Sequence, residues 1–278
     1  MVGRAVDQAC QSLGDEVIAY DHLSLDISDA DSVKRELANS KPDAVINCAA
    51  WTDVDGCERD PAQAKAANAD GPENLAIASR AVGAVLVTIS TDYVFDGQKE
   101  GYYTQRDDPH PTSVYGRAKL AGERRAQLAS ARTIVVRSGF IYGPGGRNFL
   151  STIADRVRHE EQVEAITDAW GTPTYSLHLA ARLRDLAQLD LPGTYHIVNS
   201  GAGASYEEFA RAVVQELGKG QTLVRSVMSR SLTRPAPRPQ NSRLKCLISQ
   251  AIGLSPLPPW REALRDFLGV SESSGRVS

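Results

Sequence analysis

The feature that most constrains the fold of this chain is a repeated alternation of short apolar segments with helical ones. The apolar segments have the length and composition of buried strands and cover Glu16 to Tyr20, Asp43 to Asn47, Ala84 to Ser90 and Arg132 to Arg137. Between them lie helical patterns over Asp31 to Asn39, Pro61 to Val82 and Ser113 to Ala129, with Ser28 at the N-cap position of the first. Apolar strands that alternate with helices indicate a parallel sheet covered on both faces. We therefore predict an α/β fold with a doubly wound, Rossmann-type sheet that binds ligands beyond the carboxyl ends of its strands.

The pattern loosens after Tyr142, which indicates a second, smaller unit. We predict helices over Phe149 to His159 and Trp260 to Leu268, a helix opened by the capping box Ser205 to Glu208, and a strand over Thr194 to Asn199. The proline-rich segment Arg234 to Pro239 predicts an extended loop. The resulting division is a dinucleotide-binding domain over 1–142, to which 177–198 return, a C-terminal substrate lobe over 143–176 and 199–270, and a tail over 271–278.

Three side chains in the first unit suggest carbonyl reduction. Tyr115 and Lys119 are four residues apart at the start of a predicted helix, so both lie on one face of it, one turn apart. Thr91 ends the preceding apolar strand, and a hydroxyl at that place lies where a parallel sheet binds its ligands. A phenol, an ammonium and a hydroxyl so arranged can protonate a carbonyl oxygen while a cofactor delivers hydride.

The composition excludes several other classes of protein. The chain has 278 residues, of which 42% are apolar, and its net charge of −3 does not favour nucleic acid or a membrane surface as a partner. No apolar run approaches the roughly 20 residues that span a bilayer, and no secretory signal is evident. The four cysteines form no C-x-x-C pair, so we predict reduced thiols, a cytoplasmic protein and no metal site.

On these residues the chain resembles the extended short-chain dehydrogenase/reductase superfamily and, within it, the dTDP-4-dehydrorhamnose reductase family. The resemblance runs almost from end to end. Its most specific parts are the block Ser90 to Gly97 and the segment Arg238 to Leu244, and further matching blocks cover Leu25 to Asp29, Asn47 to Asp55, Asn68 to Ala76, Val114 to Leu120, Asp168 to Thr174 and Gly193 to His196.

The resemblance implies a role for each member of the catalytic set. Tyr115 would protonate the C4 carbonyl oxygen of a nucleotide-linked keto sugar as hydride arrives from NADPH or NADH. Lys119 would lower the pKa of that phenol and bond the nicotinamide ribose, and Thr91 would hydrogen-bond the same carbonyl.

The resemblance also implies binding residues. Cofactor contacts would come from Gly3, Asp26, Ile27, Ala49, Ala50 and Thr52, together with Tyr115 and Lys119. Substrate contacts would come from Thr91, Asp92, Tyr93, Phe140, Asn148 and Arg238. Many members of the family carry tryptophan where this chain has Phe140. Asp21 favours NADH, whereas the family often uses NADPH or both, so both cofactors stay open.

The family pattern begins with a strand and a G-x-x-G-x-x-G loop, of which only Gly3 has a counterpart here. We therefore expect the first strand and the start of the glycine-rich loop to be absent, and we expect that strand to belong between the Asp43 and Ala84 strands. Two explanations stay open, a misplaced start or a truncated product with doubtful activity.

The function expected from the sequence is NAD(P)H-dependent reduction of dTDP-4-dehydro-L-rhamnose to dTDP-L-rhamnose, a precursor for polysaccharide synthesis. Two alternatives remain, namely a reductase of another nucleotide-linked 4-keto sugar and a non-catalytic nucleotide-binding regulatory subunit with the same fold. The expected partner is the nucleotide-sugar substrate rather than nucleic acid or a membrane, and a homodimer is the assembly to test.

Overall fold

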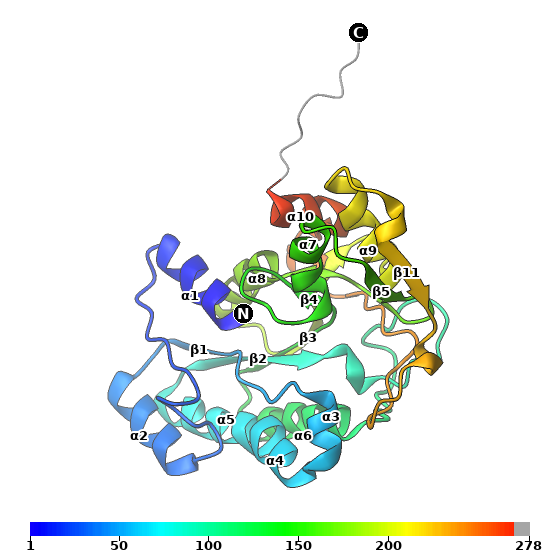
Figure 1. Cartoon of the computed structure of the whole chain (residues 1–278). Helices are drawn as coiled ribbons and strands as arrows, with labels where there is room; N and C mark the ends of the chain where they lie inside the picture. The colour runs from blue at the N-terminus through cyan, green and yellow to red at the C-terminus, as the bar shows by residue number, and fades with distance from the viewer. Residues whose placement is uncertain (270–278) are drawn as a thin grey trace.

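A four-stranded parallel sheet organises the first part of the molecule (Figure 1). The computed structural model describes residues 1–269, so the tail expected over Ser271 to Ser278 lies outside the described residues. The strands lie in the order β1, β2, β3, β8, with bounds Ala44–Asn47, Val85–Thr91, Thr133–Ser138 and Gly193–His196. All three pairings are parallel, which brings the carboxyl ends of β1, β2 and β3 to one edge of the sheet.

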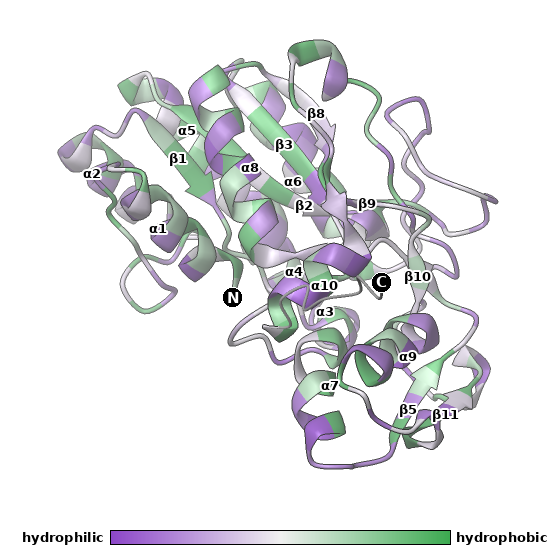
Figure 2. Cartoon of the chain, turned by 90° about the horizontal axis from the view of Figure 1, so that it is seen from above, coloured by the Kyte–Doolittle hydropathy of each residue, from purple (hydrophilic) through white to green (hydrophobic). Residues whose placement is uncertain are grey.

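Helices cover both faces of this sheet, as the sequence pattern predicts (Figure 1). Helices α1 (Val2–Ser12) and α8 (Ser176–Leu189) pack on one face, where Val85, Val87 and Ile134 are buried against them. Helices α2 (Ala30–Ser40), α5 (Gly71–Val82) and α6 (Val114–Ala129) cover the other face, onto which Leu86 points. Figure 2 shows β1, β2 and most of β3 as hydrophobic ribbons, whereas β8 is more polar.

The connection from β1 to α5 is also helical. It contains α3 (Val54–Arg59), α4 (Pro61–Lys65) and the π-helical turn η1 (Ala66–Asp70). The single helix expected over Pro61 to Val82 is thus continuous, but its middle turn is π-helical rather than α-helical. A close approach explains the position of α6 beside this turn, because a Cβ on Gly122 would lie 2.2 Å from the Asn68 carbonyl oxygen.

The second part of the molecule has its own apolar core. Helices α7 (Phe149–Arg158), α9 (Tyr206–Glu216) and α10 (Trp260–Leu268) enclose buried rings of Tyr142 and Phe209 together with the parallel pair β5 (Val163–Ile166) and β11 (Val224–Val227). Short elements complete it, namely β4 (Ile141–Tyr142), β6 (Trp170–Gly171), β7 (Thr174–Tyr175), β9 (Asn199–Ser200), β10 (Ala204–Ser205), β12 (Leu257–Pro259), and the 3-10 turns η3 (Gln221–Leu223), η4 (Ser229–Ser231) and η5 (Gln250–Ile252).

Most of the expected elements are confirmed, including the capping box at Ser205 and Glu208 that opens α9. The proline-rich segment 234–239 contains no helix or strand. Three details are wrong. The apolar segment Glu16 to Tyr20 forms no strand, because no neighbouring strand offers it hydrogen bonds. Asp29, not Ser28, caps α2, since its carboxylate accepts the amide hydrogens of Asp31 and Ser32.

The third correction concerns the order of strands. No further strand lies between the Asp43 and Ala84 strands, because β1 and β2 are hydrogen-bonded to each other in register from Ala44 opposite Val85 to Asn47 opposite Thr88. Strand β1 is therefore an edge of the described sheet. The expectation of an incomplete sheet stays a prediction.

Candidate active site

The start of α6 is held against the turn that follows β2. Ser113 caps the helix by accepting the amide hydrogen of Gly116 at 3.1 Å. Gly116 permits an unusually close approach, because a Cβ there would lie 2.3 Å from the Tyr93 carbonyl oxygen. The turn itself is the 3-10 element η2 (Asp92–Val94), capped by the Thr91 hydroxyl. This packing brings Tyr115 to the carboxyl end of β2.

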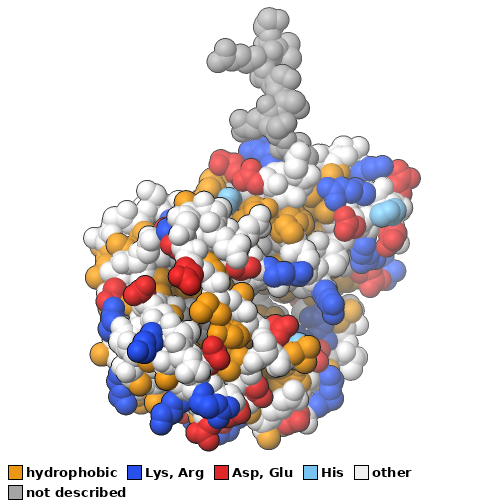
Figure 3. Space-filling model, turned by 90° about the vertical axis from the view of Figure 1, so that its left-hand side faces the viewer, with side chains coloured by type: hydrophobic (Ala, Val, Ile, Leu, Met, Phe, Trp, Pro, Cys, Tyr) orange, Lys and Arg blue, Asp and Glu red, His pale blue; other side chains and the backbone are white. Residues whose placement is uncertain are grey.

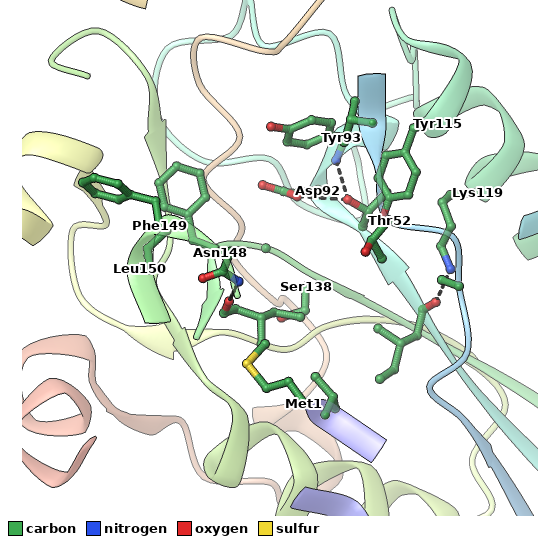
Figure 4. Close-up of a pocket in the computed structure, with 18 of the residues that line it drawn as sticks. Met1, Thr52, Asp92, Tyr93, Tyr115, Lys119, Ser138, Asn148, Phe149 and Leu150 are labelled. Atoms are coloured by element: carbon green, nitrogen blue, oxygen red, sulfur yellow. Dashed lines mark hydrogen bonds between the residues drawn. The ribbon is translucent and has the colours of Figure 1, made fainter. Parts of the chain in front are cut away.

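A cleft of about 700 Å³ opens where the sheet meets the second part of the molecule. The ends of β1, β2 and β3 form its floor, α7 and α9 contribute the opposite wall, and Figure 4 shows the side chains that converge on it. The face of the molecule drawn in Figure 3 is hollowed near its middle. Thr91, Tyr115 and Lys119 all line this cleft, so the structure brings together the three residues that the sequence singles out.

Tyr115 and Lys119 are both buried, and burial is the main influence on each. Burial raises the pKa of the Tyr115 phenol well above its ordinary value, and the neighbouring Thr91 hydroxyl offsets only part of that rise. Burial lowers the pKa of Lys119 to about 8. The Lys119 ammonium donates to the Ile89 carbonyl oxygen at 2.7 Å, which leaves two of its three protons for a ligand. Lys119 is not among the groups that shift the pKa of Tyr115, so the lowering of the phenol pKa expected from Lys119 is not seen in the described part of this structure.

Asp92 lies beneath these groups and is almost completely buried. Its carboxylate accepts the Thr91 hydroxyl proton at 3.1 Å through Oδ1 and the Ser242 hydroxyl proton at 2.5 Å through Oδ2. Burial raises the pKa of Asp92 to about 6, although both hydrogen bonds act in the opposite direction. Asp92 is thus a titratable carboxyl group at the floor of the cleft.

Aromatic rings line the part of the cleft away from α1. The Tyr93 and Tyr115 rings meet edge to face with centroids 6.0 Å apart, and the Phe140 and Tyr206 rings lie 4.5 Å apart. Phe140 has a φ of 46°, a left-handed conformation that few residues other than glycine adopt. Its ring fits against Gly171, where a Cβ would lie 2.2 Å from the Phe140 ring.

The residues expected to contact a cofactor are only partly brought together. Gly3, Ala50 and Thr52 line the cleft, and the first turn of α1 faces it. Ala49 is exposed beside the cleft, its amide fixed by a 3.0 Å hydrogen bond to the Asn47 side chain. Asp26 and Ile27 are not among the lining residues. Their roles stay predictions.

Asn148 and Arg238 also have structural partners. Asn148 caps α7 and donates to the Ile141 carbonyl oxygen at 2.8 Å, although it still lines the cleft. Arg238 forms a two-point ion pair with Asp55, with nitrogen–oxygen distances of 2.6 and 2.9 Å. It lines a small cavity that adjoins the cleft at Tyr93, Phe140 and Tyr206.

Comparison with known proteins decides the family. The model of the RmlD substrate binding domain family matches residues 1–272. The chain belongs to this family. It is 39% identical over 283 residues to a dTDP-4-dehydrorhamnose reductase from Streptomyces griseus, covering 99% of this chain and 93% of the relative. A probable dTDP-4,6-dihydroxy-2-methyloxan-3-one 4-ketoreductase from Streptomyces antibioticus is 34% identical over 268 residues, covering 96% and 90%.

Solved structures of family members superpose closely on this chain. The dTDP-4-dehydrorhamnose reductase of Bacillus anthracis, determined in complex with NADP, is 31% identical and gives a TM-score of 0.92 over 97% of this chain and 95% of that one. The corresponding structure from Clostridium acetobutylicum is 33% identical and gives 0.91 over the same shares. The expected α/β fold with a parallel, Rossmann-type sheet and the expected family are thereby confirmed.

Several cleft residues of this family member escape prediction from the sequence. Tyr206, Arg234 and Ser242 reach the site from loops and a helix far along the chain, and no local spacing relates them to Thr91. Ser90 and Ser138 also line the cleft, and their buried hydroxyls have no hydrogen-bond partner in the described part of the chain. The helices of residues 1–269 include none with the length and apolarity required to cross a bilayer, and the same residues hold no cluster of metal-binding side chains.

Proposed function

We propose that this protein reduces the C4 carbonyl of dTDP-4-dehydro-L-rhamnose with NADPH or NADH and so forms dTDP-L-rhamnose. The observation that carries the proposal is the meeting of Thr91, Tyr115 and Lys119 in one cleft at the carboxyl edge of the sheet. Membership of the RmlD family, with reductases as near relatives over the whole chain, supports the same reaction.

The cleft fits a dinucleotide. The first turn of α1 offers backbone N–H groups to a pyrophosphate, and the partnerless hydroxyls of Ser90 and Ser138 offer further hydrogen bonds near the sheet edge. The two free protons of Lys119 suit ribose hydroxyls. A reduced nicotinamide, when bound, supplies the hydride. Gly3, Ala50 and Thr52 would lie along the cofactor. Substitution of Lys119 is the most direct test of these cofactor contacts.

Tyr115 is the proposed proton donor. Because burial raises its pKa, the phenol keeps its proton until a stronger base, the alkoxide that forms at C4, lies against it. The proton then passes from the Tyr115 oxygen to the C4 oxygen. The Lys119 ammonium offsets the negative charge left on the phenol, and Thr91 holds the carbonyl toward it.

The sugar and its nucleotide would lie against the aromatic wall. Tyr93 and Phe140 present flat surfaces that suit a deoxysugar, since such a sugar has apolar faces. Arg234 lines both cavities and is the guanidinium best placed for a diphosphate. Arg238, which the ion pair with Asp55 holds at the smaller cavity, would contact the same part of the substrate. Asp92 and Asn148 would complete the substrate contacts.

A second substrate class deserves the same assay. One relative is a probable 4-ketoreductase of a different dTDP-linked sugar, so a different 4-keto sugar is the second candidate.

The test is a turnover assay with purified protein, NADPH or NADH, and each keto sugar. The measurement is loss of reduced nicotinamide together with mass-spectrometric identification of the product. Tyr115→Phe serves as the control. Cofactor binding without turnover of any keto sugar would refute the reductase and favour the non-catalytic regulatory subunit.

Two organisational proposals accompany this function. Residues 1–142 with 177–198 would form the cofactor lobe, and 143–176 with 199–270 the substrate lobe. A homodimer is proposed as the assembly, and sedimentation velocity on the same preparation tests it.

A further inference from the structure

The direction of one hydrogen bond at the floor of the cleft has a chemical consequence. The Thr91 hydroxyl carries a single proton, and it donates that proton to Asp92 Oδ1 at 3.1 Å. The Thr91 hydroxyl oxygen in turn accepts the Tyr93 amide hydrogen at 3.1 Å (Figure 4). In this arrangement Thr91 has no proton to offer to a carbonyl oxygen in the cleft.

The protonation state of Asp92 determines the direction of the hydrogen bond between Thr91 and Asp92. The Ser242 hydroxyl lies 2.5 Å from Oδ2 and 3.3 Å from the Trp170 carbonyl oxygen, and the shorter contact takes its single proton, so Oδ2 is occupied as an acceptor. A proton taken up by Asp92 therefore belongs on Oδ1, the oxygen that faces Thr91. The carboxyl group then donates to the Thr91 oxygen, and the Thr91 proton is free to turn toward the cleft.

We propose that Asp92 and Ser242 are positioning residues that set the direction of the Thr91 hydrogen bond, and that Thr91 donates to the substrate carbonyl only while Asp92 is protonated. This inference rests on the proposed reduction. It adds to that reaction a carboxyl group that acts through Thr91, and it gives a role to Ser242, which comes from the segment between Arg238 and Leu244.

The surroundings of Asp92 permit such a protonation change. The titratable groups that face it are phenols, Tyr93 on its own turn, Tyr115 on α6 and Tyr206 on α9. Gly139, which follows β3, approaches so closely that a Cβ would lie 2.4 Å from the carboxyl group. None of the ion pairs among residues 1–269 includes Asp92, and Arg234 and Arg238 act on the neighbouring phenol of Tyr206. Burial without a paired cation is the environment that raises a carboxyl pKa, here to about 6.

Two substitutions separate this inference from a purely structural role. In the wild type, kcat/KM for reduction should be highest below the pKa of Asp92 and fall as pH rises through it. Asp92→Asn presents an amide N–H to Thr91 at every pH, so that fall should disappear. Ser242→Ala removes a hydrogen bond that favours the carboxylate. The decrease in kcat/KM should therefore occur at a pH higher by about one unit or more. Ser231→Ala, whose hydroxyl donates to the Met228 carbonyl oxygen, is the matched control and should leave the pH dependence of kcat/KM unchanged.

An infrared titration of the protein without substrate gives a second readout. The band of a protonated carboxyl group should vanish in Asp92→Asn and should persist to higher pH in Ser242→Ala than in the wild type. An unchanged pH profile in Asp92→Asn, or an unmoved infrared titration in Ser242→Ala, would overturn the inference. Failure of the wild type to reduce any keto sugar would instead refute the proposed function, since the infrared titration does not depend on turnover.

Discussion

Replacing Gly116 by alanine should lower turnover by about 10²-fold while the protein still folds. The added Cβ would lie 2.3 Å from the Tyr93 carbonyl oxygen, whereas ordinary contact begins at 3.4 Å. The obstacle is backbone, which cannot rotate away, so the start of α6 must move by about 1 Å. Tyr115 is the adjacent residue and moves with it. A displacement of about 1 Å of a reacting group costs roughly 10²-fold in rate.

The stability of this variant should change far less than its rate. Alanine favours helix over glycine by up to about 1 kcal/mol, which offsets part of the steric cost. The assays are kcat/KM with the keto sugar, cofactor affinity by titration, and denaturant unfolding. Gly220→Ala is the control, because its Cβ would meet only Thr222 Oγ1, at an ordinary 3.5 Å, and lies outside the cleft. Turnover within threefold of wild type, or a loss that only follows the folded fraction, would refute the reasoning.

Four further predictions concern single side chains. Tyr115→Phe should reduce turnover by about 10² to 10⁴-fold with cofactor affinity retained, and unchanged turnover would rule out its role as acid. Lys119→Ala should weaken both cofactor binding in a titration and turnover in the reductase assay, and a wild-type result in both would contradict the assignment. Arg238 lowers the pKa of Asp55 from 3.8 to about 2, so this pair contributes stability above pH 4 that is lost as pH falls toward 2. Arg238→Gln should therefore be less stable than wild type at neutral pH, with a difference that shrinks in acid unfolding curves; a difference that does not depend on pH would argue against the pair. Burial raises the pKa of Cys48 to about 12, so Cys48→Ser should retain activity in the same assay, and complete loss with an intact fold would show that the thiol takes part.

The sequence predicts those parts of the molecule that depend on local patterns. Apolar runs place β2 and β3, and four-residue spacing places Tyr115 above Lys119 on α6. Thr91 follows from its position at a strand end. Each of these depends on residues close together in the chain, where periodicity carries the information.

The remaining features depend on long-range packing and could not be predicted in this way. Ser242 meets Asp92 across 150 positions, and Tyr206 reaches Phe140 from a separate helix. The segment from Glu16 to Tyr20 has strand composition, but a strand also needs a neighbour, which composition does not reveal. The environment of Asp92 likewise depends on residues from three separate parts of the chain, namely Tyr115, Gly139 and Ser242.

The left-handed backbone at Phe140 limits how the sugar wall can change. Branching at Cβ makes a positive φ costly, so valine, isoleucine and threonine are poor replacements there, whereas asparagine or another aromatic residue is better tolerated. Substitutions that keep the backbone but alter the ring are therefore the accessible routes to a different sugar. A library that samples only tryptophan, tyrosine, histidine and asparagine at this position would examine substrate range without first disturbing the fold.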